Sequence, residues 1–99
     1  MNIDEIVKRI GFFRYKQNIS ARELSLKIGK NDSYIKQLEK TKFNLSTNAL
    51  IEIIDALEVS YEEFFSPNYK TYYIDKDLYN TIIKLPEEKK KSLSDFLKK

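Results

Sequence analysis

The stretch of residues 20–40 restricts the fold more than any other part of the chain, because it holds two short helix patterns on either side of a glycine. Ser20 and Glu23 have the spacing of a capping box, in which each side chain accepts a hydrogen bond from the backbone amide of the other residue. Gly29 ends the first pattern, since glycine accepts a positive φ at little cost. Asn31 is the expected N-cap of the second helix. The stretch therefore predicts two helices that meet at a tight corner.

Similar helix patterns on both sides of this corner predict a bundle. Apolar residues recur every three or four positions, and short polar loops separate the patterns. The further N-caps that we expect are Asn2 with Glu5, Ser46 or Thr47, and Ser60 with Glu63. The expected inward-facing residues are Ile3, Ile6, Val7, Ile10, Phe13, Ala21, Leu24, Ile28, Tyr34, Ile35, Leu38, Leu50, Ile51, Ile54, Leu57, Phe64 and Phe65. Residues 1–66 are thus predicted to form an all-α bundle of five helices.

A second region follows, over residues 67–99. The run Ser66-Pro67-Asn68 marks the boundary, and the aromatic, β-prone segment Tyr69–Ile74 is either a linker or a short extended segment. Asp75 is the expected cap of a sixth helix, and Pro86 fits the first turn of a seventh. Their apolar faces consist of Leu78, Ile82 and Ile83 and of Leu93, Phe96 and Leu97. We expect a C-terminal extension of two short helices.

Composition narrows the possible functions. The chain contains no cysteine and no histidine, and its carboxylates lack calcium-loop spacing, so we expect no metal, no cofactor and no enzymatic activity. No apolar run approaches the ~18–20 residues of a membrane span, and the N-terminus lacks the pattern of a secretion signal. These features favour a cytoplasmic protein without a membrane partner, and no small-molecule site is evident.

The charge is distributed unevenly along the chain. Residues 1–42 contain ten Lys or Arg and five Asp or Glu, whereas residues 43–66 contain five acidic residues and no Lys or Arg. The formal net charge of the whole chain is only +3. A basic half followed by an acidic quarter is typical of a domain with one anion-seeking face, although random surface charge gives the same pattern.

The outward face of the helix at about residues 31–40 carries groups that suit double-stranded DNA. Ser33 and Gln37 lie four residues apart, and glutamine bonds adenine bidentately. Asp32 is able to accept from cytosine, and Lys36 to reach guanine or a phosphate. Lys40 and Lys42 are placed to touch phosphates.

A longer ordered pattern resembles the lambda-repressor/Cro type helix-turn-helix family, the xenobiotic-response-element group of bacterial and phage regulators. The resemblance covers residues 6–65 and implies a five-helix, DNA-binding fold. The residues that carry it are Arg14, Ser20-x-x-Glu23-Leu24-Ser25-x-x-Ile28-Gly29, Tyr34-Ile35-x-x-Leu38-Glu39, Leu50, Ile51, Ile54, Leu57-Glu58-Val59 and Phe64-Phe65.

The resemblance also implies roles for individual residues. It places Asn31, Asp32, Ser33 and Gln37 at base-reading positions, and Ser20, Lys40 and Lys42 at phosphate-contacting positions. Arg14 and Glu39 fall on a pair that in the family is a structural ion pair. The sequence departs from the family pattern in that Ala21 replaces a usual glutamine that touches DNA, Thr41 a glycine, Leu45 a proline and Ser25 an alanine.

Two functional hypotheses follow from these observations. The first is a sequence-specific transcriptional repressor, which binds DNA as a homodimer through residues 67–99 because a palindromic operator needs two reading helices about 34 Å apart. The second is a protein-interaction module on the same fold, of an antitoxin-like or anti-repressor kind, which binds through the aromatic C-terminal segment. Ala21 and the modest net charge keep the second hypothesis open.

Overall fold

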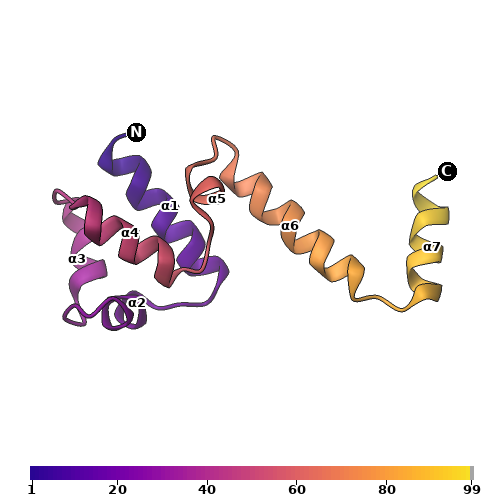
Figure 1. The fold of residues 1–99 in the computed structure, drawn as a ribbon, viewed down its shortest axis with the longest axis horizontal. Coiled ribbons are helices and arrows are strands. Elements are labelled where there is room, and N and C mark those ends of the chain that lie inside the picture. The colour runs from indigo at the N-terminus through magenta and orange to yellow at the C-terminus, as the bar shows by residue number, and fades with distance from the viewer. Residues whose placement is uncertain (99) are drawn as a thin grey trace. The chain divides into compact units, whose positions relative to one another are not determined.

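All regular secondary structure in the described residues, 1–98 of this computed structural model, is helical. The described residues form two compact units, Met1–Pro67 and the residues from Asn68 onward. The first unit contains five helices and the second contains two, as Figure 1 shows. Their bounds are α1 Ile3–Lys16, α2 Ala21–Lys27, α3 Tyr34–Thr41, α4 Thr47–Ala56, α5 Tyr61–Phe65, α6 Tyr69–Ile83 and α7 Glu87–Leu97.

Side-chain caps begin four of the five helices of the first unit. Asn2 caps α1 by accepting from the Glu5 amide at 2.9 Å. Ser20 caps α2 in a complete capping box with Glu23, as predicted. The two remaining predicted caps are also confirmed, with Ser46 rather than Thr47 at the start of α4 and Ser60 at the start of α5. Each such cap satisfies an amide that the helix itself leaves without a partner.

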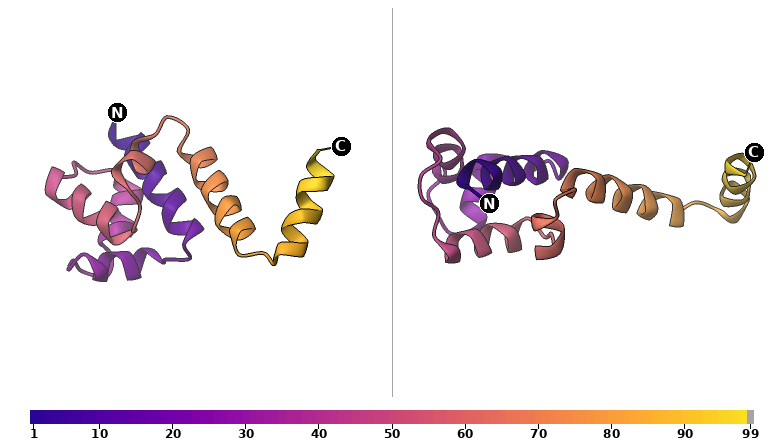
Figure 2. Two further views of the ribbon diagram at one scale, coloured as in Figure 1. Left: turned by 45° about the vertical axis from the view of Figure 1, so that its right-hand side comes forward. Right: turned by 90° about the horizontal axis from the view of Figure 1, so that it is seen from above.

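The core of the first unit lies where α3 packs against α1 and α2, and where α2 packs against α4 (Figures 1 and 2). The core extends to α5, where the ring of Phe64 stacks on that of Phe13 from α1 with their centroids 5.8 Å apart. Both rings are fully buried, as are Leu24, Ile35 and Leu38. Complete burial of such a side chain stabilises a fold by about 1.5–3 kcal/mol, so these contacts hold the short helices α2 and α3 in place.

The buried face of α4 differs from the prediction. Ala49 and Ile53 lie in the core beside Ile54, whereas the predicted core residue Ile51 is 41% exposed. Phe65, at the end of α5, is 41% exposed as well. The reason is that apolar residues stand next to one another at two places in α4. A rotation of the helix by one residue therefore still buries a continuous apolar stripe.

A buried arginine that the sequence did not reveal joins α1 to the end of α5. Arg9 is 5% exposed, and its Nη1 donates to the carbonyl oxygens of Phe64 at 2.8 Å and Ser66 at 2.7 Å. Carbonyl groups at a helix C-terminus lack partners within the helix, and a cation satisfies them well. Arg9 therefore fixes the end of the first unit.

In the second unit, α6 is longer than predicted. Residues Tyr69–Ile74 are helical, so neither the linker nor the extended segment is correct, and Asp75 lies inside α6 instead of capping it. Both views in Figure 2 show α6 as one uninterrupted helix. A continuous helix gives the backbone N–H and C=O groups of these residues hydrogen-bond partners. This stabilisation outweighs the β-propensity of the tyrosines. Pro86 directly precedes α7 rather than lying in its first turn.

Candidate nucleic-acid interface

The corner between α2 and α3 is held by backbone geometry and one buried hydroxyl. Gly29 has a φ of 73°, which is the left-handed conformation that the turn requires. The Ser25 Oγ is fully buried, donates to the Ala21 carbonyl at 2.7 Å and accepts from the Ile35 amide at 2.9 Å. Because Ile35 lies in the first turn of α3, this hydroxyl satisfies an otherwise orphaned amide and fixes α3 against α2.

The beginning of α3 is later than predicted. Ser33 is the N-cap residue and makes no side-chain cap, so the prediction of Asn31 as the N-cap is wrong. The Asn31 Oδ1 instead accepts from the amide of Ser33 at 3.1 Å and from its hydroxyl at 2.9 Å. Asparagine often bonds the backbone two residues on and so builds a turn. Asn31, Asp32 and Ser33 therefore lie in a turn that leads into α3.

The two faces of α3 differ sharply in character. Ile35 and Leu38 are fully buried, while Lys36, Gln37 and Lys40 are exposed along the opposite face. Tyr34 is half-buried beside Phe43, with ring centroids 5.5 Å apart. Burial and the nearby Glu52 carboxylate raise the pKa of Tyr34 above the ordinary value of a tyrosine. The exposed face of α3 therefore presents two ammonium groups and one amide to solvent.

The end of α3 differs from the family pattern because Thr41 stands where a glycine is usual. Thr41 is still helical, and its Oγ1 donates to the Gln37 carbonyl at 2.8 Å. The left-handed position falls instead on Lys42, with a φ of 52° and a ψ of 44°. Its Nζ lies 3.0 Å from the Asp4 Oδ1 at the start of α1, and both side chains are about half exposed. No sequence signal indicated this ion pair, because its partners are far apart in the chain.

An ion pair links α1 to α3 behind the exposed face. The Arg14 Nη2 lies 3.0 Å from the Glu39 Oε1, and its Nε donates to the Oε2 at 3.2 Å. The Arg14 Nη1 also donates to the Ile19 carbonyl at 3.2 Å. The side chains are 11% and 23% exposed, so the pair is largely shielded from solvent. Bidentate geometry fixes the orientation of α3 as well as its position.

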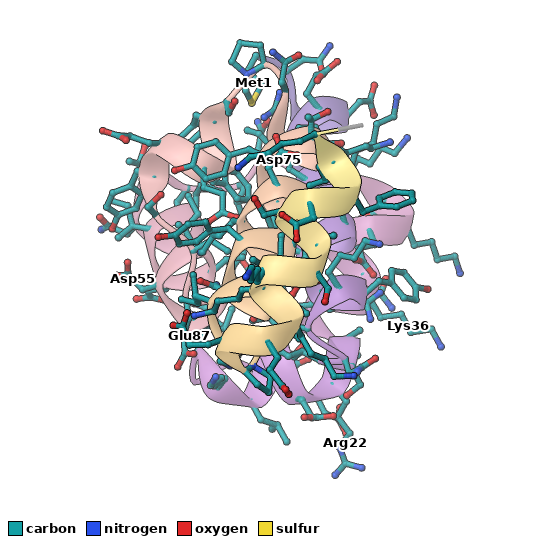
Figure 3. The ribbon with its side chains drawn as sticks, turned by 90° about the vertical axis from the view of Figure 1, so that its right-hand side faces the viewer. Met1, Arg22, Lys36, Asp55, Asp75 and Glu87 are labelled. Atoms are coloured by element: carbon teal, nitrogen blue, oxygen red, sulfur yellow. The ribbon has the colours of Figure 1, made fainter. Side chains whose placement is uncertain are left out.

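The charges of the first unit are separated in space. Figure 3 shows Lys36 directed outward at the right edge, Arg22 at the lower edge and Asp55 at the left edge. Asp55 lies on α4 together with Glu52, and both are exposed. The α3 side is therefore cationic and the α4 side anionic, which orients a molecule toward a polyanion.

Ser20 completes the set of predicted site residues and is the N-cap of α2. It is exposed, and its hydroxyl accepts from the Glu23 amide at 3.0 Å. Within residues 1–98, no group of three or more carboxylates is arranged to hold a metal ion. None of the helices described here is both long enough and apolar enough to span a bilayer.

Comparison with known proteins assigns the class of this fold. The sequence matches the model of a helix-turn-helix family over residues 13–64, which is more than half of the chain. The chain belongs to this family, the lambda-repressor/Cro-like helix-turn-helix proteins of the xenobiotic-response-element type. No curated protein and no solved structure matches the chain. The predicted family and the all-α fold class are confirmed, and the family is one of DNA-binding regulators.

Proposed function

We propose that this protein is a sequence-specific transcriptional repressor that inserts α3 into the major groove of DNA. The observation that carries the proposal is the exposed face of α3, with Lys36, Gln37 and Lys40 opposite a fully buried apolar face. A single α-helix fits the major groove, and exposed polar side chains on it reach the base edges. Repression follows where a bound copy covers a promoter.

Five residues are proposed to read bases: Asn31, Asp32, Ser33, Lys36 and Gln37. The first three lie in the turn before α3, which in this docking mode enters the groove ahead of the helix. The turn bonds occupy the side-chain oxygen of Asn31 and leave its amide nitrogen to donate. Lys36 and Gln37 contribute from the first turns of the helix itself, where glutamine favours adenine and lysine favours guanine.

Three residues are proposed to contact phosphates: Ser20, Lys40 and Lys42. Ser20 and Lys40 are exposed at the beginning of α2 and near the end of α3. Lys42 must first exchange its contact with the Asp4 carboxylate for a phosphate oxygen. An exposed ion pair contributes about 0–1 kcal/mol, so this exchange costs little.

Substitution of Gln37 tests base reading, and Lys40 is the matched control on the same face. Gln37→Ala is expected to weaken cognate binding by about 1–3 kcal/mol and to relax the preference at one base pair. Lys40→Ala is expected to weaken binding to every sequence about equally and to reduce the salt slope by about one. Fluorescence anisotropy with cognate and scrambled duplexes at several salt concentrations measures both effects. Parent-like binding by both variants would contradict the docking mode.

We further propose that the second unit forms a homodimer. In the described residues α6 and α7 contain no buried residue, and Leu78, Ile83, Phe96 and Leu97 are 47–70% exposed. Apolar faces of this kind are covered in most proteins, and a second copy supplies an identical pair of faces. A dimer also brings two copies of α3 to the two halves of a palindromic operator.

Sedimentation equilibrium tests the dimer. The parent is expected to sediment as a dimer at about tens of micromolar, because the apolar faces of α6 and α7 are then covered. Leu78→Lys is expected to yield a monomer, while Ile51→Lys on the exposed side of α4 leaves the dimer intact. A monomeric parent at that concentration removes the dimer from the proposal.

One observation favours the protein-interaction alternative as a second candidate. Tyr72, Tyr79 and Phe96 are exposed in the second unit, and aromatic side chains are enriched at protein interfaces. Salt separates the two candidates, since DNA affinity falls steeply between low and moderate salt whereas a contact through tyrosines changes little.

A further inference from the structure

We propose that Arg22 binds a phosphate of the DNA backbone. This contact replaces the DNA contact of the family's usual glutamine, which Ala21 is unable to make. This inference rests on the proposed docking of α3 in the major groove. Alanine has neither a donor nor an acceptor on its side chain, so the position that commonly carries a glutamine in this family contributes nothing polar here. The neighbouring residue on α2 carries a guanidinium group.

The position of Arg22 on α2 places it beside α3. Residues three apart on a helix are surface neighbours, so Arg22 adjoins Ser25. The Ser25 Oγ accepts from the amide of Ile35, which is 2.9 Å away in the first turn of α3. The stripe of α2 that carries Arg22 therefore borders the beginning of α3, where Lys36 follows Ile35. Figure 3 shows Arg22 directed outward at the lower edge and Lys36 at the right edge, both away from Asp55 at the left.

The other two arginines of the chain already have structural roles. Arg14 is held by Glu39 and the Ile19 carbonyl, and Arg9 by the carbonyls of Phe64 and Ser66. Arg22 is exposed, and in residues 1–98 its guanidinium makes no hydrogen bond or ion pair. A phosphate contact therefore requires Arg22 to break no existing interaction, in contrast to Lys42.

The adjacent carboxylate does not neutralise Arg22. The Glu23 Oε1 accepts from the Ser20 amide in the capping box of α2, and successive helical residues point about 100° apart. The planar fork of a guanidinium also binds two phosphate oxygens at once, which a lysine ammonium does not do. Arg22 thus combines a free charge, a long reach and a place at the cationic side of the unit.

Salt titrations of DNA binding test the role of Arg22. Arg22→Gln is expected to lower the affinity about 5–20-fold for cognate and scrambled duplexes alike, and to reduce the slope of log K against log salt by about one. The matched control is Lys27→Gln, because Lys27 is an exposed cation on the same helix whose Nζ lies on the α4 side, 3.2 Å from the Ala56 carbonyl oxygen. This control is expected to change the affinity less than about twofold. Thermal unfolding of both variants is expected to match the parent, since both side chains are exposed.

A rescue experiment separates a phosphate contact from a general charge effect. Arg22→Lys restores the charge without the planar fork, so it is expected to recover only part of the affinity lost in Arg22→Gln, whereas a general charge effect would recover all of it. Equal slopes for Arg22→Gln, Lys27→Gln and the parent would overturn the role of Arg22 while leaving the proposed function intact. A parent without salt-dependent DNA binding would overturn both.

Discussion

Replacing Ile53 by alanine is expected to lower the free energy of unfolding by about 3 kcal/mol, whereas the same replacement at Ile51 lowers it by less than about 1 kcal/mol. Ile53 is fully buried on α4 and Ile51 is 41% exposed, although they are only two residues apart on the same helix. Truncation of a buried isoleucine loses its transfer free energy and leaves a cavity, and the two effects together cost about 2–5 kcal/mol. Chemical denaturation followed by far-ultraviolet circular dichroism measures both values.

The two variants control for each other, because they change the same atoms and the same helix propensity. A larger loss for Ile51→Ala would mean that α4 buries the face that the sequence predicted. Equal losses would mean that both side chains are buried, for example through a further contact of the exposed side of α4.

The second large effect is expected at the ion pair between α1 and α3. Arg14→Met is expected to cost about 2–4 kcal/mol of unfolding free energy, because it leaves the Glu39 carboxylate largely buried without its partner. Glu39→Met is expected to cost a similar amount. The double variant is expected to be more stable than the sum of the two losses implies, since no charge then remains unpaired. Denaturation of all three variants in one buffer gives the coupling energy.

Additive losses in this cycle would contradict the pair as a structural link. The loss of DNA binding by the single variants is expected to follow their loss of stability. At temperatures where each variant is fully folded, a retained affinity would show that the pair supports α3 without touching DNA.

Local patterns in the sequence predicted the caps of α1, α2, α4 and α5 and the glycine of the corner, but not the caps of α3 and α6. Ser20, Ser46 and Ser60 each bond an amide three residues ahead, and such a short-range interaction is readable from residue type and spacing alone. The role of Gly29 in the corner was predicted for the same reason, because the turn requires a positive φ at one position.

Where two local solutions compete, the sequence did not decide between them. Asparagine at position 31 is suited both to an N-cap and to a turn in which its side chain accepts from the Ser33 amide. The structure has the turn. The segment from Tyr69 has β-propensity, yet its helix period is also present, since Tyr69 and Tyr73 are half-buried four residues apart. In α4 the choice of face depends on packing against α2, which no local pattern contains.

Interactions between distant residues were accessible only through the resemblance or not at all. The pairing of Arg14 with Glu39 was implied by the family and not by any spacing in the chain. The contacts of Arg9 with the end of α5 and of Lys42 with Asp4 had no such guide. The exposed face of α3, by contrast, followed from helix period alone, because Ile35 and Leu38 define the buried side.

Selection of bound duplexes from a random DNA pool, carried out at low and at moderate salt, tests the central proposal most directly. We expect the parent to enrich a palindromic sequence whose half-sites lie about one helical turn, or a multiple of it, apart. The moderate-salt pool is expected to keep the same sequence with fewer weak sites, since salt weakens phosphate contacts and leaves the base preference. Gln37→Ala is expected to lose the preference at one base pair in each half-site. A parent that enriches no sequence at either salt concentration would contradict base reading by α3.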